Sequence, residues 1–250
     1  MHIKIMGILN ATPDSFFDSY PDPVVAAARA LAMPADIIDI GGESTRPGSL
    51  QVSENEELDR VLPVISLLKG SKSLSIDTYK PAVAEKALAA GCSIINDVTG
   101  LENPLMRELA ASTSCPAIIM HSRGLHAKMG KNTLYEEGVI PHLISWFEKR
   151  ITLLLNAGIK KENIIIDPGI GFDKTPQQNY EILKGIPILK TLGFPLLIGL
   201  SRKSFLNKSL AATIAANTYA VLQGADIMRV HDVQEARHMI DFVANIQKID

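Results

Sequence analysis

The chain has 250 residues, with 25 basic and 27 acidic side chains, and 46% of its residues are hydrophobic while only 5% are aromatic. The balanced charge argues against an extended nucleic-acid-binding surface, so any anion site must be local. The sequence contains no run of about 18 apolar residues, which argues against a membrane-spanning helix.

Short apolar runs predict strands along the whole chain. They show little polar alternation, which is typical of parallel strands covered on both faces. The predicted strands comprise residues 3–9, 36–40, 73–76, 93–95, 117–120, 163–166, 196–199 and 226–230.

Helical segments follow these strands. Ser53 is a suitable N-cap, Pro81 suits the first turn of a helix, and Gly91 suits the position just after one. The predicted helices comprise residues 24–33, 54–68, 81–90, 104–111, 134–156, 178–192, 205–223 and 234–246.

The repeated order of strand and helix predicts an α/β fold, a single (β/α)8 TIM barrel, for which about 250 residues is a typical length. An open, doubly wound sheet is the structural alternative, because periodicity does not show whether a sheet closes. Since no linker-like stretch divides the chain, we expect one domain over residues 1–250.

The cysteines and the start of the chain indicate a reducing compartment. Cys92 and Cys115 lack the spacing of a metal or redox motif and are expected to be buried, reduced thiols. The first residues lead directly into a strand and lack the apolar region and cleavage site of a signal peptide. The expected location is therefore cytoplasmic.

Polar side chains gather at the carboxyl ends of the predicted strands. In a barrel these ends share one face, where the active site is found. One such residue alone is more often a helix cap, but this reading does not explain the whole set. The set comprises Asn10, Asp39, Asp77, Asn96, Asp97, His121, Asp167, Ser201, Arg202, Lys203, Arg229 and His231.

One half of the predicted pocket suits a flat heterocycle. Asp77, Asn96, Asp167 and Lys203 offer carboxylate, amide and ammonium groups. Such groups complement the N–H and carbonyl edge of a guanine-like or pterin-like ring. A metal site is the alternative for two nearby carboxylates, although the amide and the lysine favour the heterocycle.

The other half suits an anion. Ser44, Thr45 and Arg46 lie on a Gly-rich loop. Arg229 and His231 lie at the last strand. Hydroxyls and arginine forks bind phosphate oxygens well, so we expect a diphosphate that departs as a leaving group. Mg²⁺ would neutralise its charge, with Asn10 as a protein ligand.

Two features leave alternatives open. His121 is either a buried, hydrogen-bonded histidine or part of the pocket wall. The predicted loops 11–23 and 41–52 are long enough to act as lids that exclude water, and simple surface connectors are the other interpretation.

Two motifs stand at the ends of the first two predicted strands: residues 7–16, GILNATPDSF, and residues 39–48, DIGGESTRPG. They resemble the first-loop and second-loop signatures of dihydropteroate synthases. The resemblance continues through residues 75–78, 96–100, 120–121, 167–172, 201–205 and 229–233.

This resemblance implies a transferase of folate biosynthesis. The implied reaction is Mg²⁺-dependent and condenses 6-hydroxymethyl-7,8-dihydropterin pyrophosphate with p-aminobenzoate to 7,8-dihydropteroate. Sulfonamides would compete, and the enzyme would be a homodimer that binds small molecules and neither nucleic acid nor a membrane.

The resemblance also implies residue roles. The pterin residues would be Asp77, Asn96, Val98, Met120, Asp167, Lys203 and Arg229. The pyrophosphate residues would be Asn10, Arg46, Arg229 and His231, with Asn10 also at the metal. The p-aminobenzoate residues would be Thr45, Pro47, Phe172, Lys203 and Ser204. The implied catalytic set is Asn10, Arg46, Asp77, Asp167, Lys203, Arg229 and His231.

The chain departs from the family pattern in two connections. Residues 18–22 form a shorter stretch without the usual glycines, and the connection after Lys203 is also short. A loop with fewer glycines and more proline is stiffer, so these departures concern loop dynamics and rate. The alternatives are a pterin-binding methyltransferase-type domain, against which the anion residues argue, and a non-catalytic paralogue.

Overall fold

Parallel strands form the centre of the molecule. The structure is a computed structural model, and it describes residues 3–12, 22–44, 49–124 and 133–248. The strands are β1 (Lys4–Asn10), β2 (Ile37–Gly41), β3 (Ser73–Asp77), β4 (Ile94–Asp97), β5 (Ala117–Met120), β6 (Ile164–Asp167), β7 (Leu197–Ile198) and β8 (Ile227–Val230). They form one sheet in the order β6-β5-β4-β3-β2-β1-β8-β7, with parallel pairing.

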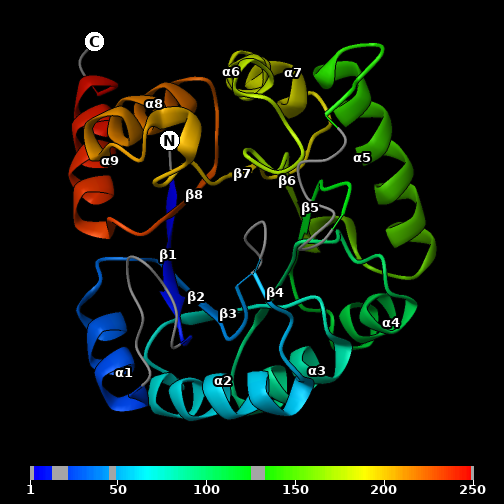
Figure 1. The fold of residues 1–250 in the computed structure, drawn as a ribbon, viewed down its shortest axis with the longest axis vertical. Coiled ribbons are helices and arrows are strands. Elements are labelled where there is room, and N and C mark those ends of the chain that lie inside the picture. The colour runs from blue at the N-terminus through cyan, green and yellow to red at the C-terminus, as the bar shows by residue number, and fades with distance from the viewer. Residues whose placement is uncertain (1–2, 13–21, 45–48, 125–132, 249–250) are drawn as a thin grey trace.

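A single bridge brings the two edges of this sheet together. Ile166 of β6 pairs with Leu196, the residue before β7, and the Ile166 N–H donates to the carbonyl oxygen of Pro195 at 2.9 Å. The sheet therefore forms a nearly closed barrel with helices around it (Figure 1). The predicted barrel is confirmed, and the open doubly wound alternative is wrong.

Helices surround the strands in chain order. They are α1 (Pro23–Ala32), α2 (Glu54–Leu68), α3 (Pro81–Ala90), α4 (Pro104–Thr113), α5 (Val139–Asn156), α6 (Pro176–Lys184), α7 (Ile186–Lys190), α8 (Leu210–Leu222) and α9 (Val233–Ile246). Ser53 accepts from the Glu56 N–H at 3.2 Å, as its predicted N-cap role requires. The predicted bounds of α2 and α3 match the structure.

Three predicted helices differ from the structure because of local backbone chemistry. The segment 134–156 becomes helical only at Val139, after Gly138 with φ +88°. The segment 178–192 divides at Gly185, and Pro187 lies in the first turn of α7. The segment 205–223 starts as a short 3-10 helix, and two residues with positive φ separate it from α8.

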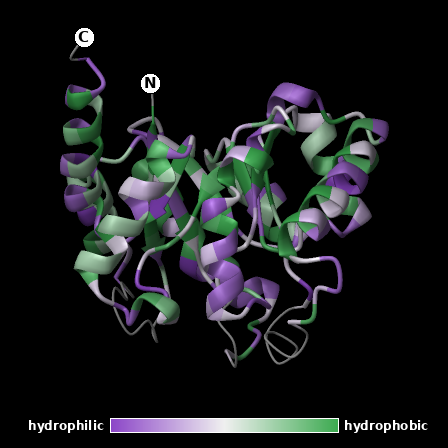
Figure 2. Ribbon diagram, turned by 90° about the horizontal axis from the view of Figure 1, so that it is seen from above, coloured by the Kyte–Doolittle hydropathy of each residue, from purple (hydrophilic) through white to green (hydrophobic). Residues whose placement is uncertain are grey.

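The barrel has an apolar floor and a polar layer above it. A small cluster fills the interior, and Figure 2 shows that the central strands are mostly hydrophobic. Two residues further along four of these strands, the same inward face carries Asp39, Asn96, Asp167 and Arg229. The floor comprises Met6, Ile37, Ile94, Ile118, Ile165, Leu197 and Ile227.

The outward faces of the strands pack against the helices in a much larger core. Gly7 illustrates the close approach, because an added Cβ would lie 3.0 Å from Val233 and 3.1 Å from Met33. Cys92 and Cys115 are buried, unbonded thiols, as predicted. Within the described residues, we find no helix long and apolar enough to cross a membrane.

Candidate active site

Arg229 organises the polar layer at the carboxyl end of the barrel. Its Nε donates to Asp39 Oδ2 at 2.7 Å, and a terminal guanidinium nitrogen donates to Asp77 Oδ2 at 2.5 Å. Asn96 Nδ2 donates to the same Asp39 oxygen at 2.9 Å. The structure thus brings together three predicted pterin residues, Asp77, Asn96 and Arg229, around one carboxylate.

Burial and charge set the electrostatics of this group. Burial raises the pKa of Asp77 to about 7, although Arg229 opposes the shift. Nearby Asp39 and Asp77 raise the pKa of Arg229 against the effect of its burial, so the guanidinium stays charged. The site therefore combines a fixed cation with a carboxyl group that can exchange a proton near neutral pH.

Unsatisfied polar atoms face the same layer. Asp39 Oδ1 and Ser75 Oγ are buried and have no hydrogen-bond partner within the described part of the chain. The two residues are neighbours in the ladder between β2 and β3. Because buried polar groups are normally hydrogen-bonded, these atoms offer partners to a polar ligand or ordered water.

Asp167 and Lys203 are the other two residues predicted to bind the flat heterocycle. Asp167 Oδ1 accepts from the Gly169 N–H at 2.8 Å. Burial raises the pKa of Asp167, and the charges of Lys203 and Arg229 partly offset this effect. Lys203 Nζ lies 4.4 Å from the centroid of the Phe172 ring, a cation–π contact.

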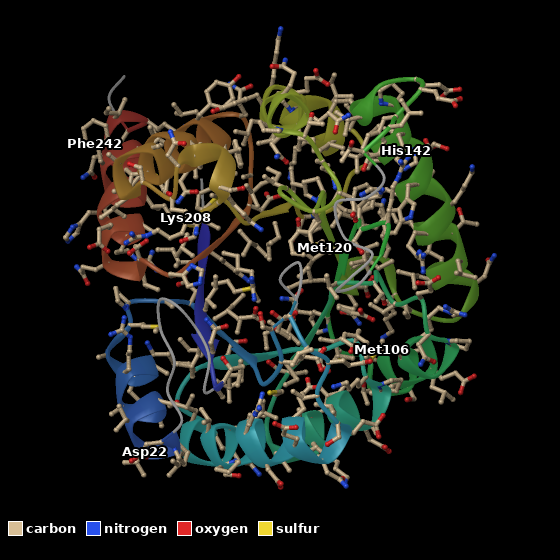
Figure 3. All side chains as sticks on the ribbon, in the orientation of Figure 1. Asp22, Met106, Met120, His142, Lys208 and Phe242 are labelled. Carbon is tan, nitrogen blue, oxygen red and sulfur yellow. The ribbon has the colours of Figure 1, made fainter. Side chains whose placement is uncertain are left out.

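Two apolar residues lie beside these polar groups. Met120 pairs with Asp167 in the ladder between β5 and β6, and it lies toward the centre of the ring of helices (Figure 3). Val98 follows β4, and its carbonyl oxygen accepts from Ser122 Oγ at 3.0 Å. Both side chains are buried.

The loops after β7 and β8 are joined through Ser201. Its Oγ lies 3.0 Å from His231 Nδ1 and accepts from the His231 N–H at 3.2 Å. Arg202 has φ +57° and forms a two-bond ion pair with Asp232. The chain turns at these two residues, and α8 begins only at Leu210.

The remaining predicted residues are less closely grouped. Asn10 ends β1 and pairs with Gly41, whose added Cβ would lie 3.6 Å from the Cβ of Asp77. Ser204 is exposed, next in sequence to Lys203. Thr45, Arg46 and Pro47 lie outside the described residues.

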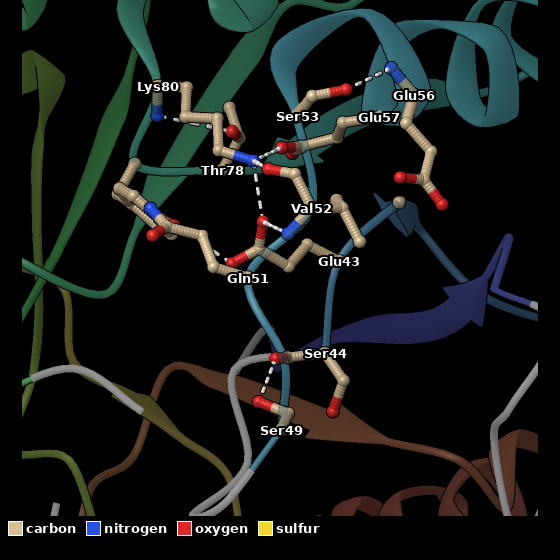
Figure 4. A network of polar contacts seen from close by, with 12 residues as sticks. Glu43, Ser44, Ser49, Gln51, Val52, Ser53, Glu56, Glu57, Thr78 and Lys80 are labelled. Carbon is tan, nitrogen blue, oxygen red and sulfur yellow. Dashed lines mark hydrogen bonds and ion pairs between the residues drawn. The ribbon is translucent and has the colours of Figure 1, made fainter. Parts of the chain in front are cut away.

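A buried lysine that the sequence analysis did not single out anchors the loop after β2. Lys80 Nζ bonds Glu43 Oε2 at 2.5 Å, Glu57 Oε2 at 2.7 Å and the carbonyl oxygen of Val52 at 2.7 Å (Figure 4). Tyr79 donates to the other Glu43 oxygen at 2.9 Å. Lys80 therefore holds both ends of this loop against α2.

His121 is resolved as a buried histidine held by polar neighbours. Its side chain packs edge-to-face against Trp146, and its Nε2 lies 3.2 Å from His142 Nε2. Burial and neighbouring positive charges lower the pKa of His121 to about 2, so the ring stays neutral. This arrangement directs it toward α5 and away from the wall of the polar layer.

Fold and site together define a barrel enzyme with a cationic and carboxylate layer at the carboxyl ends of its strands. The sequence matches the family of pterin-binding enzymes over residues 6–231. The chain is 43% identical to the dihydropteroate synthase of Synechocystis, covering 92% of this chain and 85% of that protein.

Further comparisons agree. A probable bifunctional folylpolyglutamate synthase/dihydropteroate synthase of Haloferax volcanii is 44% identical over 92% of this chain, which spans only 29% of that longer protein. The dihydropteroate synthase of Yersinia pestis, solved with a sulfonamide drug, is 38% identical with a TM-score of 0.93, covering 98% of this chain and 94% of that one. The chain therefore belongs to the dihydropteroate synthase family of pterin-binding enzymes.

Proposed function

We propose that the chain condenses 6-hydroxymethyl-7,8-dihydropterin pyrophosphate with p-aminobenzoate to give 7,8-dihydropteroate and pyrophosphate. The C–O bond to the diphosphate breaks, and the leaving group takes the electron pair. The amine of p-aminobenzoate then forms the new C–N bond at the methylene carbon and loses a proton. The observation that carries this proposal is Arg229, a charged guanidinium between two carboxylates in the polar layer.

The pterin half of the proposed site uses the groups already paired there. Asp77, Asn96 and Asp167 would bind the N–H edge of the ring, and Lys203 would donate to a ring nitrogen or carbonyl. Val98 and Met120 would contact its flat faces.

The diphosphate would bind Asn10, Arg46, Arg229 and His231. A Mg²⁺ ion bound with the diphosphate would fit this donor set, because Mg²⁺ keeps several waters and phosphate oxygens as ligands and needs few protein ligands. Asn10 supplies a hard amide oxygen at the end of β1, which matches that demand. When bound, the ion would neutralise charge on the departing diphosphate. Arg229 holds the same charge from the protein side.

We assign p-aminobenzoate to Thr45, Pro47, Phe172, Lys203 and Ser204. The contact between Lys203 and the Phe172 ring supports this assignment, because an aromatic ring and a cation suit a flat carboxylate-bearing substrate. The Yersinia pestis relative was solved with a sulfonamide drug, which supports the proposal that sulfonamides compete with p-aminobenzoate in this chain.

The direct test is pyrophosphate release from the pterin substrate, with and without p-aminobenzoate and Mg²⁺. We expect release that requires both. Measurable pterin binding without any release would overturn the synthase reaction and favour a non-catalytic paralogue. Release without added or trace Mg²⁺ would remove only the metal from the proposal.

A matched pair of arginine variants tests the site. Arg229→Ala should weaken pterin pyrophosphate binding, because it removes the cation between Asp39 and Asp77. Arg237→Ala removes an arginine that pairs with Asp36 at 2.9 Å near the other end of the barrel, and it should leave binding unchanged. Equal effects of the two variants would contradict the assigned anion site.

We also propose a cytoplasmic homodimer built as one domain over residues 1–250. Apolar side chains on α8 and α9 support an interface there: Tyr219, Leu222, Phe242 and Ile246 are all exposed, and Phe242 points outward in Figure 3. Sedimentation of the wild type and of Phe242→Glu tests this. A monomeric wild type, or a dimer that persists in the variant, would contradict the proposed interface.

A further inference from the structure

Lys174 is a buried ammonium that the reaction as described does not use. It lies in the loop between β6 and α6, and the residue is only 8% exposed. The Nζ atom donates to the carbonyl oxygens of Gly169 at 2.9 Å and Phe172 at 2.8 Å, and it lies 3.1 Å from His121 Nδ1. Three N–H groups thus meet three good acceptors.

The hydrogen bonds of Phe172 depend on this lysine. Its carbonyl oxygen bonds Lys174 directly, and its N–H donates at 3.0 Å to Gly169, whose carbonyl oxygen also accepts from Lys174. Asp167, in contrast, is held by the ladder to β5, and its carbonyl oxygen accepts from the His121 N–H at 2.9 Å. Lys174 therefore holds the loop from Gly169 to Phe172, whereas the backbone of Asp167 is held by β5.

The loop is also packed tightly against β5. Gly169 has φ +66°, and an added Cβ would lie 2.1 Å from the His121 carbonyl oxygen. Tyr135 donates to the Asp173 carbonyl oxygen at 3.1 Å, and Asp173 Oδ2 accepts from the Arg123 N–H at 2.8 Å. These contacts hold the loop close to the end of β5, and Lys174 lies among them.

The contact with the lysine also fixes the proton on His121. An ammonium group has donors only, so Nδ1 of the neutral ring must accept and the proton must lie on Nε2. That Nε2–H then donates to His142 Nε2, so His142 carries its proton on Nδ1. The position of the proton on His121 can be detected by spectroscopy without any turnover of substrate.

We propose that Lys174 is a positioning residue for the second substrate, which fixes the Phe172 ring beside Lys203 by gathering the loop carbonyls and His121. The inference rests on the proposed function, which assigns Phe172 and Lys203 to p-aminobenzoate. It predicts a separation between the two substrates, because most of the proposed pterin residues, Asp167 among them, lie on the strands, while Phe172 lies on the loop.

The test compares Lys174→Met with Lys190→Met. Lys190 pairs with Asp226 at 2.5 Å, away from the β6–α6 loop. Assays below the pKa of Lys174, which burial lowers to about 7, keep its ammonium form. Lys174→Met should raise the KM for p-aminobenzoate about tenfold and leave the KM for the pterin substrate within about twofold. Lys190→Met should change neither.

Two further measurements keep the inference testable if Lys174→Met does not fold. His121→Asn retains an acceptor near the Nδ1 position, while His121→Leu does not, so only the leucine variant should raise the KM for p-aminobenzoate. Nitrogen NMR of the wild type should show His121 protonated on Nε2. The proposal would be overturned by an unchanged KM for p-aminobenzoate in folded Lys174→Met. It would also be overturned by equal KM values in the two His121 variants, or by a proton on Nδ1 of His121. A wild type that does not turn over would instead refute the proposed function.

Discussion

Asp39 pairs with Nε of Arg229 within the polar layer and orients its guanidinium. A single oxygen of this fully buried carboxylate accepts from Arg229 Nε at 2.7 Å and from Asn96 at 2.9 Å. The residues that contact substrate in the proposed reaction are thus oriented by a fully buried neighbour in the same layer. Without Asp39, the bond to Asp77 is the one that the described residues would still make to the guanidinium.

Asp39→Ala should cost about 3–5 kcal/mol of unfolding free energy, because it leaves a partly buried guanidinium with one of its two partners. Asp232→Asn provides the comparison, since its pair with Arg202 is more exposed and should contribute about 1 kcal/mol or less. Urea unfolding measures both. Similar losses in the two variants would show that Asp39 is not the principal support of Arg229.

Asp167→Asn should weaken pterin binding by about 1–3 kcal/mol through loss of a charge-assisted hydrogen bond. The control is Asp97→Asn, because Asp97 is also buried but faces the helices and accepts from the N–H and Oγ1 of Thr99, both at 2.7 Å. Calorimetric titration with the pterin should separate them. Unchanged affinity in Asp167→Asn would place the ring elsewhere.

The raised pKa of Asp77 predicts a pH dependence of stability. Burial raises it from an ordinary value of 3.8 to about 7, so between these values the folded protein holds a proton that the unfolded chain has released. The free energy of unfolding should therefore fall as pH rises from about 4 to 7 and level off above. Asp77→Asn should lack this component, and thermal unfolding of both proteins across that range checks it. A parallel pH dependence in the two proteins would contradict the assignment.

Lys80→Met should destabilise the protein by about 3–5 kcal/mol, because it leaves Glu43 and Glu57 buried without their shared cation. Lys190→Met removes a more exposed pair and should cost about 1 kcal/mol or less. Part of the loss should be recovered in the double variant Lys80→Met, Glu57→Gln, which removes one unpaired charge. Chemical denaturation of the wild type, Lys80→Met, Glu57→Gln and the double variant measures this recovery. A double variant whose loss equals the sum of the two single losses would contradict the reasoning.

Much of the fold was predictable because it depends on local chemistry. Ser53 and Pro81 mark the starts of α2 and α3, and the apolar runs mark the strands within a residue or two. The divided helices at Gly185 and after Leu206 were missed, since a helical periodicity continues in sequence across both interruptions. Backbone angles at a few residues decided those boundaries.

The candidate site was predictable as a set of strand ends and only partly as a set of contacts. Asn96 and Asp97 are adjacent in the sequence, yet one faces the polar layer and the other faces the helices, because side chains alternate along a strand. Lys80 and Lys174 gave no signal of their own, since a lysine is ordinarily a surface residue. Their importance follows from the carbonyl and carboxylate oxygens that surround each ammonium group in the folded chain.

The residues alone reveal the order of strands and helices, the polar strand ends and the family to which the chain belongs. They do not reveal that Arg229 contacts Asp39 and Asp77, residues 190 and 152 positions away in the chain. That contact depends on how the strands pair in the barrel. Pairing of β1 with both β2 and β8 brings the two ends of the sequence together, and inward alternation then places these charges in one layer.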